Sequence, residues 1–173
     1  MGGNVFSSCI NFQYVSILLV FSFMECSMKM MILIGLPGSG KSTYASDFKD
    51  YEVVNQDLLG NRQKCIKKTK ELLSEGKNVI IDRTNINRKQ RAIWTNIAKE
   101  HGVVDICFVE LRIEPELAFK RIKQRKNHPS IKDGTSDEKI KEIIGRFVSE
   151  YEEPHANEDY TSYTVFYDYN FSF

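Results

Sequence analysis

The segment at residues 30–50 constrains the fold of this chain more than any other. Residues 35–42 read GLPGSGKS and match the pattern G-x-x-x-x-G-K-S/T at every fixed position. An unbroken apolar run, MMILIG at 30–35, predicts a strand buried on both faces, and residues 41–50 predict a helix. A buried strand, a glycine-rich loop and a helix in this order predict a phosphate-binding loop.

The fixed residues of this loop have expected chemical roles. The glycines permit backbone conformations that a Cβ atom would forbid, so that a row of N–H groups can face a phosphate. The lysine is expected to reach the β- and γ-phosphates of ATP, and the serine hydroxyl is expected to ligate Mg²⁺. The serine, Ser42, is therefore the expected metal ligand. The expected nucleotide-binding residues are Gly35, Pro37, Gly38, Ser39, Gly40, Lys41, Ser42 and Thr43.

Strand-like and helix-like segments alternate along the rest of the chain. Further strands are predicted at 51–55, 78–82, 103–111 and in the aromatic segment 160–173. Further helices are predicted at 59–77, 88–101, 114–126 and 136–153, with Asn87 and Ser136 as candidate caps. This alternation predicts an α/β protein with βαβ units, namely a three-layer P-loop kinase fold whose five-stranded sheet is mainly parallel and flanked by helices.

The length, net charge and cysteine content of the chain limit the classes of protein to which it can belong. A chain of 173 residues has the size of one domain, and its net charge of +1 gives no overall basic field. The four cysteines show no metal-binding spacing and are interpreted as reduced thiols of an intracellular protein, nuclear or cytoplasmic. They lie at positions 9, 26, 65 and 107.

The first 28 residues differ from the rest of the chain. The apolar segment NFQYVSILLVFSF at 11–23 is too short for a membrane helix, and Asn11 and Gln13 interrupt it. A signal peptide would carry a basic n-region, which this segment lacks. We expect a disordered extension or a misassigned start at 1–28, followed by one domain at 29–173, with no stable membrane association. A weak targeting or membrane segment is the alternative.

Asp57 is a candidate catalytic residue outside the phosphate loop. It follows the predicted strand 51–55, and parallel sheets bind ligands beyond the carboxyl ends of their strands. A carboxylate there can orient an alcohol and take its proton during phosphoryl transfer. Aspartate before a predicted helix is also a common N-cap, so position alone leaves both roles open.

Three segments together resemble a known family. GLPGSGKST, NQDLLGNRQKC and NVIIDRTNINRKQR resemble the kinase domain of the polynucleotide 5′-hydroxyl kinases, especially that of the eukaryotic kinase/phosphatase enzymes. The resemblance runs from about Met30 to the C-terminus. It implies ATP-dependent transfer of phosphate to the 5′-hydroxyl end of DNA or RNA, in end repair or RNA processing. The remaining length leaves no room for a phosphatase domain.

The resemblance also implies roles for particular residues. Asp57 matches the general base, and Arg125 matches a lid arginine near the γ-phosphate, with Arg121 as its rival. Arg91 matches an arginine that contacts the phosphate of the acceptor. Asp82 and Asn85 belong to the expected substrate-binding segment, although Asp82 also ends a predicted strand and suits a position near Mg²⁺. A structural hydrogen bond to a loop is the third role open to Asp82. The expected catalytic residues are Lys41, Asp57 and Arg125.

The chain departs from the family pattern at two positions. Gln56 stands where the family has arginine before the general base, and Arg83 stands where the family has asparagine after the strand-terminal aspartate. The first removes a positive charge and the second adds one, so we expect a change in acceptor choice.

Two other functions fit the same motifs. One is a P-loop kinase for a small-molecule hydroxyl such as a nucleoside or sugar. The other is a nucleotide-dependent binding protein, against which the joint presence of Lys41, Ser42 and Asp57 argues.

Overall fold

The computed structural model describes residues 27–125, 131 and 134–167. Its five strands form one sheet in the order β2-β3-β1-β4-β5, and every neighbouring pair is parallel. The strands are β1 (Lys29–Ile34), β2 (Tyr51–Asn55), β3 (Asn78–Asp82), β4 (Asp105–Arg112) and β5 (Ser162–Tyr167). The predicted five-stranded parallel sheet is therefore confirmed.

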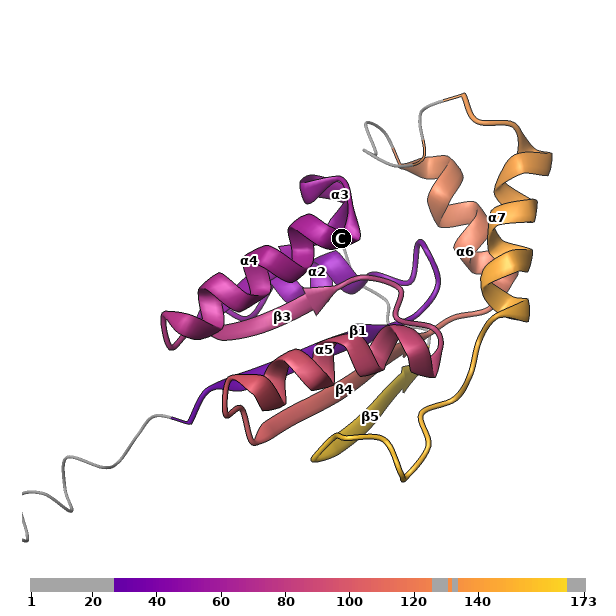
Figure 1. Cartoon of the computed structure of the whole chain (residues 1–173). Helices are drawn as coiled ribbons and strands as arrows, with labels where there is room; N and C mark the ends of the chain where they lie inside the picture. The colour runs from indigo at the N-terminus through magenta and orange to yellow at the C-terminus, as the bar shows by residue number, and fades with distance from the viewer. Residues whose placement is uncertain (1–26, 126–130, 132–133, 168–173) are drawn as a thin grey trace, which may run out of the picture.

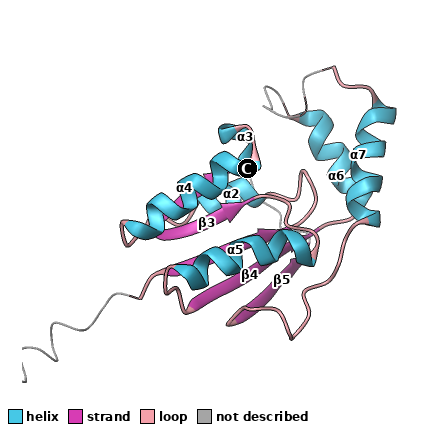
Figure 2. Cartoon of the chain, viewed as in Figure 1, coloured by secondary structure: helices cyan, strands magenta, loops and turns pink. Residues whose placement is uncertain are grey.

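Helices cover both faces of this sheet. They are α2 (Lys41–Ser46), α3 (Gln56–Leu59), α4 (Arg62–Ser74), α5 (Arg88–Glu100), α6 (Pro115–Gln124) and α7 (Asp137–Ser149). On one face, Met30 and Ile32 of β1 pack in a core with Leu72 of α4 and Trp94 of α5. On the other face, alternate residues of β1 pack with Ala45 of α2. The result is the three-layer arrangement of Figures 1 and 2.

Parallel pairing brings the functional segments to one edge of the sheet. In the register of β2 and β3, the strand-terminal residues Asn55 and Asp82 lie side by side. Strand β1 lies next to β3 and runs directly into the phosphate loop. Because the three strands point the same way, the loop, α3 and the end of β3 meet at their carboxyl ends.

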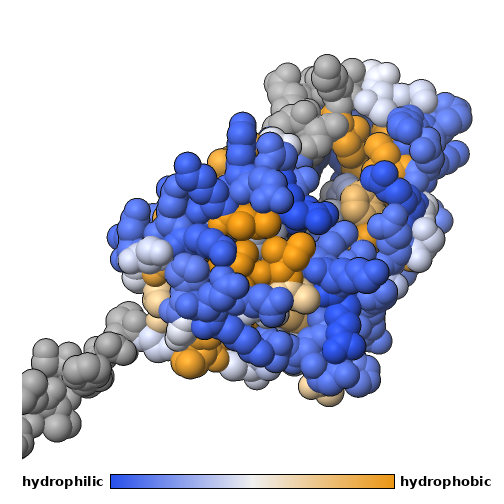
Figure 3. Space-filling view, in the orientation of Figure 1, coloured by the Kyte–Doolittle hydropathy of each residue, from blue (hydrophilic) through white to orange (hydrophobic). Residues whose placement is uncertain are grey.

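Helices α6 and α7 pair beside that edge and away from the main body (Figure 1). Ile113, Ala118, Ile122, Ile140 and Ile144 form their shared apolar core, against which Leu36 of the phosphate loop packs. Figure 3 shows a hollow between this pair and the body that carries the sheet. The pair therefore forms one wall of a space whose other wall is the sheet edge.

Several predicted boundaries differ from the structure. The predicted helix 59–77 begins only at Arg62 and ends at Ser74, because Gly60 has a φ of 87° and Asn61 then caps α4 through the N–H of Lys64. Leu59 belongs to the short helix α3 that precedes it. Helix α2 ends at Ser46 instead of residue 50. Strand β5 occupies only part of the predicted segment, whose residues 168–173 lie outside the described part of the chain. The predicted N-terminal extension lies almost wholly outside it as well.

Two predicted helix caps are confirmed. The side chains of Asn87 and Ser136 accept hydrogen bonds from the backbone N–H groups of Gln90 and Lys139. In the part of the chain that the structure describes, no helix combines the length and the apolar character that a membrane span requires.

Candidate active site

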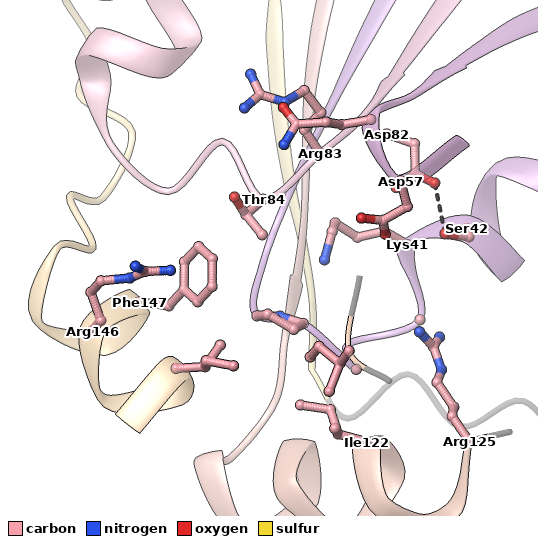
Figure 4. Close-up of a pocket in the computed structure, with 16 residues that line it drawn as sticks. Lys41, Ser42, Asp57, Asp82, Arg83, Thr84, Ile122, Arg125, Arg146 and Phe147 are labelled. Carbon is pink, nitrogen blue, oxygen red and sulfur yellow. Dashed lines mark hydrogen bonds between the residues drawn. The ribbon is translucent and has the colours of Figure 1, made fainter. Parts of the chain in front are cut away.

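A cavity of about 270 Å³ lies between the phosphate loop, the ends of β2 and β3, and the α6–α7 pair (Figure 4). From the phosphate loop and the start of α2, its lining residues are Pro37, Gly38, Gly40, Lys41 and Ser42. The other expected nucleotide-binding residues, Gly35, Ser39 and Thr43, are outside the described lining. The cavity joins polar groups from the sheet edge to an apolar wall from the helix pair.

Two positions of the phosphate loop require glycine, because of their backbone conformation and the atoms that surround them. Gly35 has a φ of 147°, and a Cβ atom there would lie 2.5 Å from the carbonyl oxygen of Leu111. Gly38 has a φ of 85°, with Ala118 O 3.0 Å from the corresponding Cβ position. The N–H of Gly35 donates to Thr84 O at 3.0 Å, which ties the loop to the residues after β3. The loop is thus held in position on both sides.

Lys41 is held inside the loop that is expected to bind the nucleotide. Its side chain is buried, and Nζ donates to Leu36 O at 2.7 Å and to Gly35 O at 3.0 Å. Burial lowers the pKa of Lys41 to about 8, although the nearby Asp82 raises it; the cation of Arg125 lowers it further. A bound anion would stabilise the charged form of this amine.

The hydroxyl of Ser42, at the start of α2, lies beside the carboxylate of Asp82, at the end of β3. The hydroxyl of Ser42 donates to Asp82 Oδ2 at 2.7 Å, which is the dashed line in Figure 4. Asn55 Nδ2 donates to the same carboxylate oxygen, and Asp82 is buried. A hydroxyl and a carboxylate suit Mg²⁺, which prefers oxygen ligands and usually keeps several waters. Of the roles left open for Asp82, the geometry suits both the one near Mg²⁺ and the structural hydrogen bond.

No cluster of three or more histidine, cysteine, aspartate or glutamate side chains that could hold a metal exists among the described residues. A metal held by Ser42 and Asp82 alone would need further oxygen ligands. Nucleotide phosphates and water are the usual source of these ligands in phosphoryl-transfer sites.

Asp57 lines the cavity from the first turn of α3. Asn55 is the N-cap of this helix, accepting a hydrogen bond from Leu58 N at 3.1 Å, and Asn61 caps α4. The alternative role of Asp57 as a cap is therefore taken by two asparagines. The charge of Asp57 also contributes to raising the pKa of Lys41, so the two groups share one electrostatic environment.

Arg125 lines the cavity from the end of α6, whereas Arg121 is not among the described lining residues. Figure 4 shows the side chain of Arg125 extending from α6 toward the space beside Lys41 and Ser42. Of the two candidate lid arginines, the structure places Arg125 at the cavity.

Arg91 corrects an expectation from the sequence. Its side chain is fully buried, with Nε and Nη2 donating to Glu158 at 2.8 and 2.7 Å. Nη1 donates to the carbonyl oxygens of Glu152 and Asn85. The expectation that Arg91 contacts the acceptor is wrong, because its donors are engaged in the core. A signal was available: Arg91 shares its helix face with Trp94, Thr95 and Ala98, at the spacing of a buried stripe.

Asn85 is likewise a structural residue. It is fully buried with a φ of 44°, its Nδ2 donates to Leu33 O at 2.7 Å, and its Oδ1 accepts from Trp94 Nε1 at 2.9 Å. The expected substrate contact is wrong, since both polar atoms of the amide already have partners. Asn85 instead connects β1 to α5.

The wall opposite the phosphate loop was missed by the sequence reasoning. Ile143, Arg146 and Phe147 of α7 line the cavity, and the guanidinium of Arg146 lies 5.3 Å from the ring centroid of Phe147 (Figure 4). The spacing of Ile143 and Phe147 on an amphipathic helix was visible in the sequence, but this spacing also occurs in ordinary cores. Only the position of α7 shows that these side chains face a cavity.

The fold and the phosphate loop define a P-loop protein with the kinase-type arrangement of a parallel sheet. The family model described as an AAA domain matches residues 60–150, and the chain belongs to this family. The Kti12 protein of Chaetomium thermophilum, solved in complex with ADP-AlF3, has a similar fold. Its TM-score is 0.61 at 17% identity over 80% of this chain and 88% of that one.

Curated relatives confirm the resemblance that the motifs carry. The bifunctional polynucleotide phosphatase/kinase of Schizosaccharomyces pombe is 31% identical over 147 residues, which are 72% of this chain and 36% of that protein. A putative bifunctional polynucleotide phosphatase/kinase of Acanthamoeba polyphaga mimivirus is 35% identical over 101 residues, 57% of this chain and 24% of that protein. The chain thus spans about a third or less of the length of these relatives.

Proposed function

We propose that this chain transfers the γ-phosphate of ATP to the 5′-hydroxyl end of DNA or RNA. The observation that carries the proposal is the presence of Asp57 in one cavity with Lys41 and Ser42. This arrangement offers an acceptor-side carboxylate opposite a loop that binds phosphate. The names of the two polynucleotide phosphatase/kinase relatives support a nucleic-acid acceptor.

In the proposed reaction, each group acts at a defined bond. Asp57 accepts a hydrogen bond from the acceptor hydroxyl and takes its proton as the new O–P bond forms. The bond between the γ-phosphorus and the β–γ bridging oxygen breaks, and ADP leaves with that electron pair. Lys41 and Arg125 neutralise the charge on the transferring group. Ser42 and Asp82 would hold Mg²⁺, which offsets negative charge on the β- and γ-phosphates when it is bound.

The proposed acceptor places the reaction where ATP and nucleic-acid ends occur together, in the nucleus or cytoplasm. End repair and RNA processing are the processes that use such a transfer. The α6–α7 pair contributes an apolar surface, with Phe147 and Ile143, against which the terminal base of a strand can pack.

The direct test is phosphate transfer from γ-labelled ATP in the presence of Mg²⁺. The acceptors are a 5′-hydroxyl DNA oligonucleotide, an RNA of the same sequence and a free nucleoside. Label on an oligonucleotide and not on the nucleoside is the expected result, and the preferred strand separates DNA from RNA. Label on the nucleoside alone would make the chain a small-molecule kinase. Nucleotide binding without transfer to any hydroxyl would favour a binding protein.

Nucleotide binding is also expected to take up a proton at alkaline pH. The buried amine of Lys41 has a pKa of about 8, and bound phosphate favours its charged form, which raises that pKa. Affinity is therefore greatest below pH 8 and falls by up to about tenfold per pH unit above it. At about pH 9, binding of ATP without divalent cations should take up about 0.9 proton.

Calorimetry in two buffers of different ionisation enthalpy measures this uptake. Lys41→Arg is the matched control, because its guanidinium stays charged and should take up no proton at this site. Equal proton uptake by the two proteins at about pH 9 would show that Lys41 is not the group that titrates.

A further inference from the structure

Arg83 lines the same cavity and plays no part in the proposed transfer step. It follows directly after β3, next to Asp82. Figure 4 shows its guanidinium at the end of the cavity that lies away from Lys41 and Arg125. Arg83 is therefore on the side where an acceptor, and not the triphosphate, would lie.

The guanidinium of Arg83 lacks partners for part of its donor set. Its Nε and Nη1 atoms are buried without a hydrogen-bond partner. Burial lowers the pKa of Arg83, and the neighbouring cation of Arg62 lowers it further. An arginine remains charged at neutral pH despite such a shift. Unpaired donors beside a second cation are stabilised by an anion that comes within hydrogen-bond distance of them.

The position of this guanidinium is fixed by aromatic packing. Its central carbon lies 5.5 Å from the ring centroid of Trp94. Trp94 is fully buried, and its Nε1 donates to Asn85 Oδ1, while Asn85 donates to Leu33 O in β1. The orientation of the ring is therefore fixed, and the ring orients the guanidinium in the absence of a ligand.

A second residue with an unpaired side-chain atom lies in the same lining. The side-chain oxygen of Gln56, the residue before Asp57, is buried without a hydrogen-bond partner. The lining next to the candidate base thus offers free donors from Arg83 and a free acceptor from Gln56. These are the two positions at which the chain departs from the pattern it resembles.

We propose that Arg83 binds the phosphate on the 3′ side of the terminal nucleoside, and thereby sets the preference for phosphate-bearing acceptors. The proposal rests on the proposed function and deepens it. Arg83 takes the acceptor-phosphate contact that the engagement of Arg91 with Glu158 rules out for that residue. The ligand is a phosphomonoester or phosphodiester attached to the nucleoside whose 5′-hydroxyl faces Asp57.

Two small acceptors test this role, a nucleoside 3′-phosphate and the same nucleoside without phosphate. In Arg83→Gln, KM for the nucleoside 3′-phosphate should rise about 10- to 100-fold with little change in kcat. KM for the plain nucleoside should stay unchanged. Arg83→Lys, which keeps the charge, should restore part of the affinity. Lys67→Gln is the matched control, because it removes an exposed charge on α4, paired with Glu71 and outside the cavity lining.

A binding titration separates failure of this proposal from failure of the proposed function. Fluorescence-detected binding of the nucleoside 3′-phosphate needs no catalysis, so it applies even if no acceptor is phosphorylated. Weaker binding in Arg83→Gln alone, with the melting temperature retained, supports the phosphate contact. Equal binding by wild type and Arg83→Gln would overturn it. An equal loss of kcat/KM for both acceptors would also overturn it, since that is the mark of a purely structural role.

Discussion

Replacement of Asp57 with asparagine is expected to reduce phosphate transfer by about 10²- to 10⁴-fold. The amide has nearly the shape of the carboxylate but cannot take the acceptor proton. The change should leave α3 and α4 intact, because Asn55 and Asn61 cap these helices. Nucleotide affinity should remain close to that of the wild type, since the loop groups that hold the phosphates are unchanged.

The loss should appear in kcat for a 5′-hydroxyl oligonucleotide, with the affinity for a fluorescent nucleotide measured in parallel. Asp47→Asn is the matched control, because Asp47 is exposed at the end of α2 and outside the cavity lining. Full activity of Asp57→Asn would show that another group is the base. A combined loss of transfer and nucleotide binding would point to a role on the nucleotide side.

Replacement of Arg91 with methionine is expected to destabilise the fold by about 3–5 kcal/mol. The change leaves the Glu158 carboxylate, whose side chain is 5% exposed, without its cation in the protein interior. It also removes the hydrogen bonds to the carbonyl oxygens of Glu152 and Asn85. The pair joins α5 to the segment before β5, residues 67 apart in sequence. Urea denaturation followed by circular dichroism measures the loss.

The double variant Arg91→Met/Glu158→Gln provides the control. It should be more stable than Arg91→Met alone, because no unpaired charge remains buried. A stable Arg91→Met protein with weak acceptor binding would instead return Arg91 to the acceptor site.

Lowering the pH should remove the contribution of the Arg91–Glu158 pair to stability. Burial raises the pKa of Glu158, but the hydrogen bonds from Arg91 and from the backbone N–H of His155, together with the charges of Arg91 and Arg88, outweigh it. The net pKa in the fold is below its usual value. The contribution of the pair is therefore complete above the pKa of an unfolded glutamate, about 4.3. It is lost as pH falls through the lower pKa of the folded state. The wild type should accordingly lose more stability than the double variant over that range.

Local sequence patterns were sufficient to predict much of the fold. The strands Tyr51–Asn55 and Asn78–Asp82 have the predicted bounds. A short apolar run between helix and turn signals is compatible with few structures other than a strand. The break between α3 and α4 was missed although Gly60 and Asn61 mark it, since one glycine within a helical pattern is often tolerated. The functional groups at strand ends were also predictable, because parallel strands gather their carboxyl ends at one edge.

The sequence by itself determined the phosphate loop, the parallel sheet and the meeting of Lys41, Ser42, Asp57 and Asp82, because each depends on local pattern and on the direction of strands. Only the tertiary structure decided which of the two arginines Arg83 and Arg91 lies at the cavity. Arg91 turns inward because Glu158, distant in sequence, lies beside it, and Arg83 stays at the cavity because Trp94 supports its guanidinium there. Contacts of this kind depend on which elements pack together, which the order of residues along one segment does not contain.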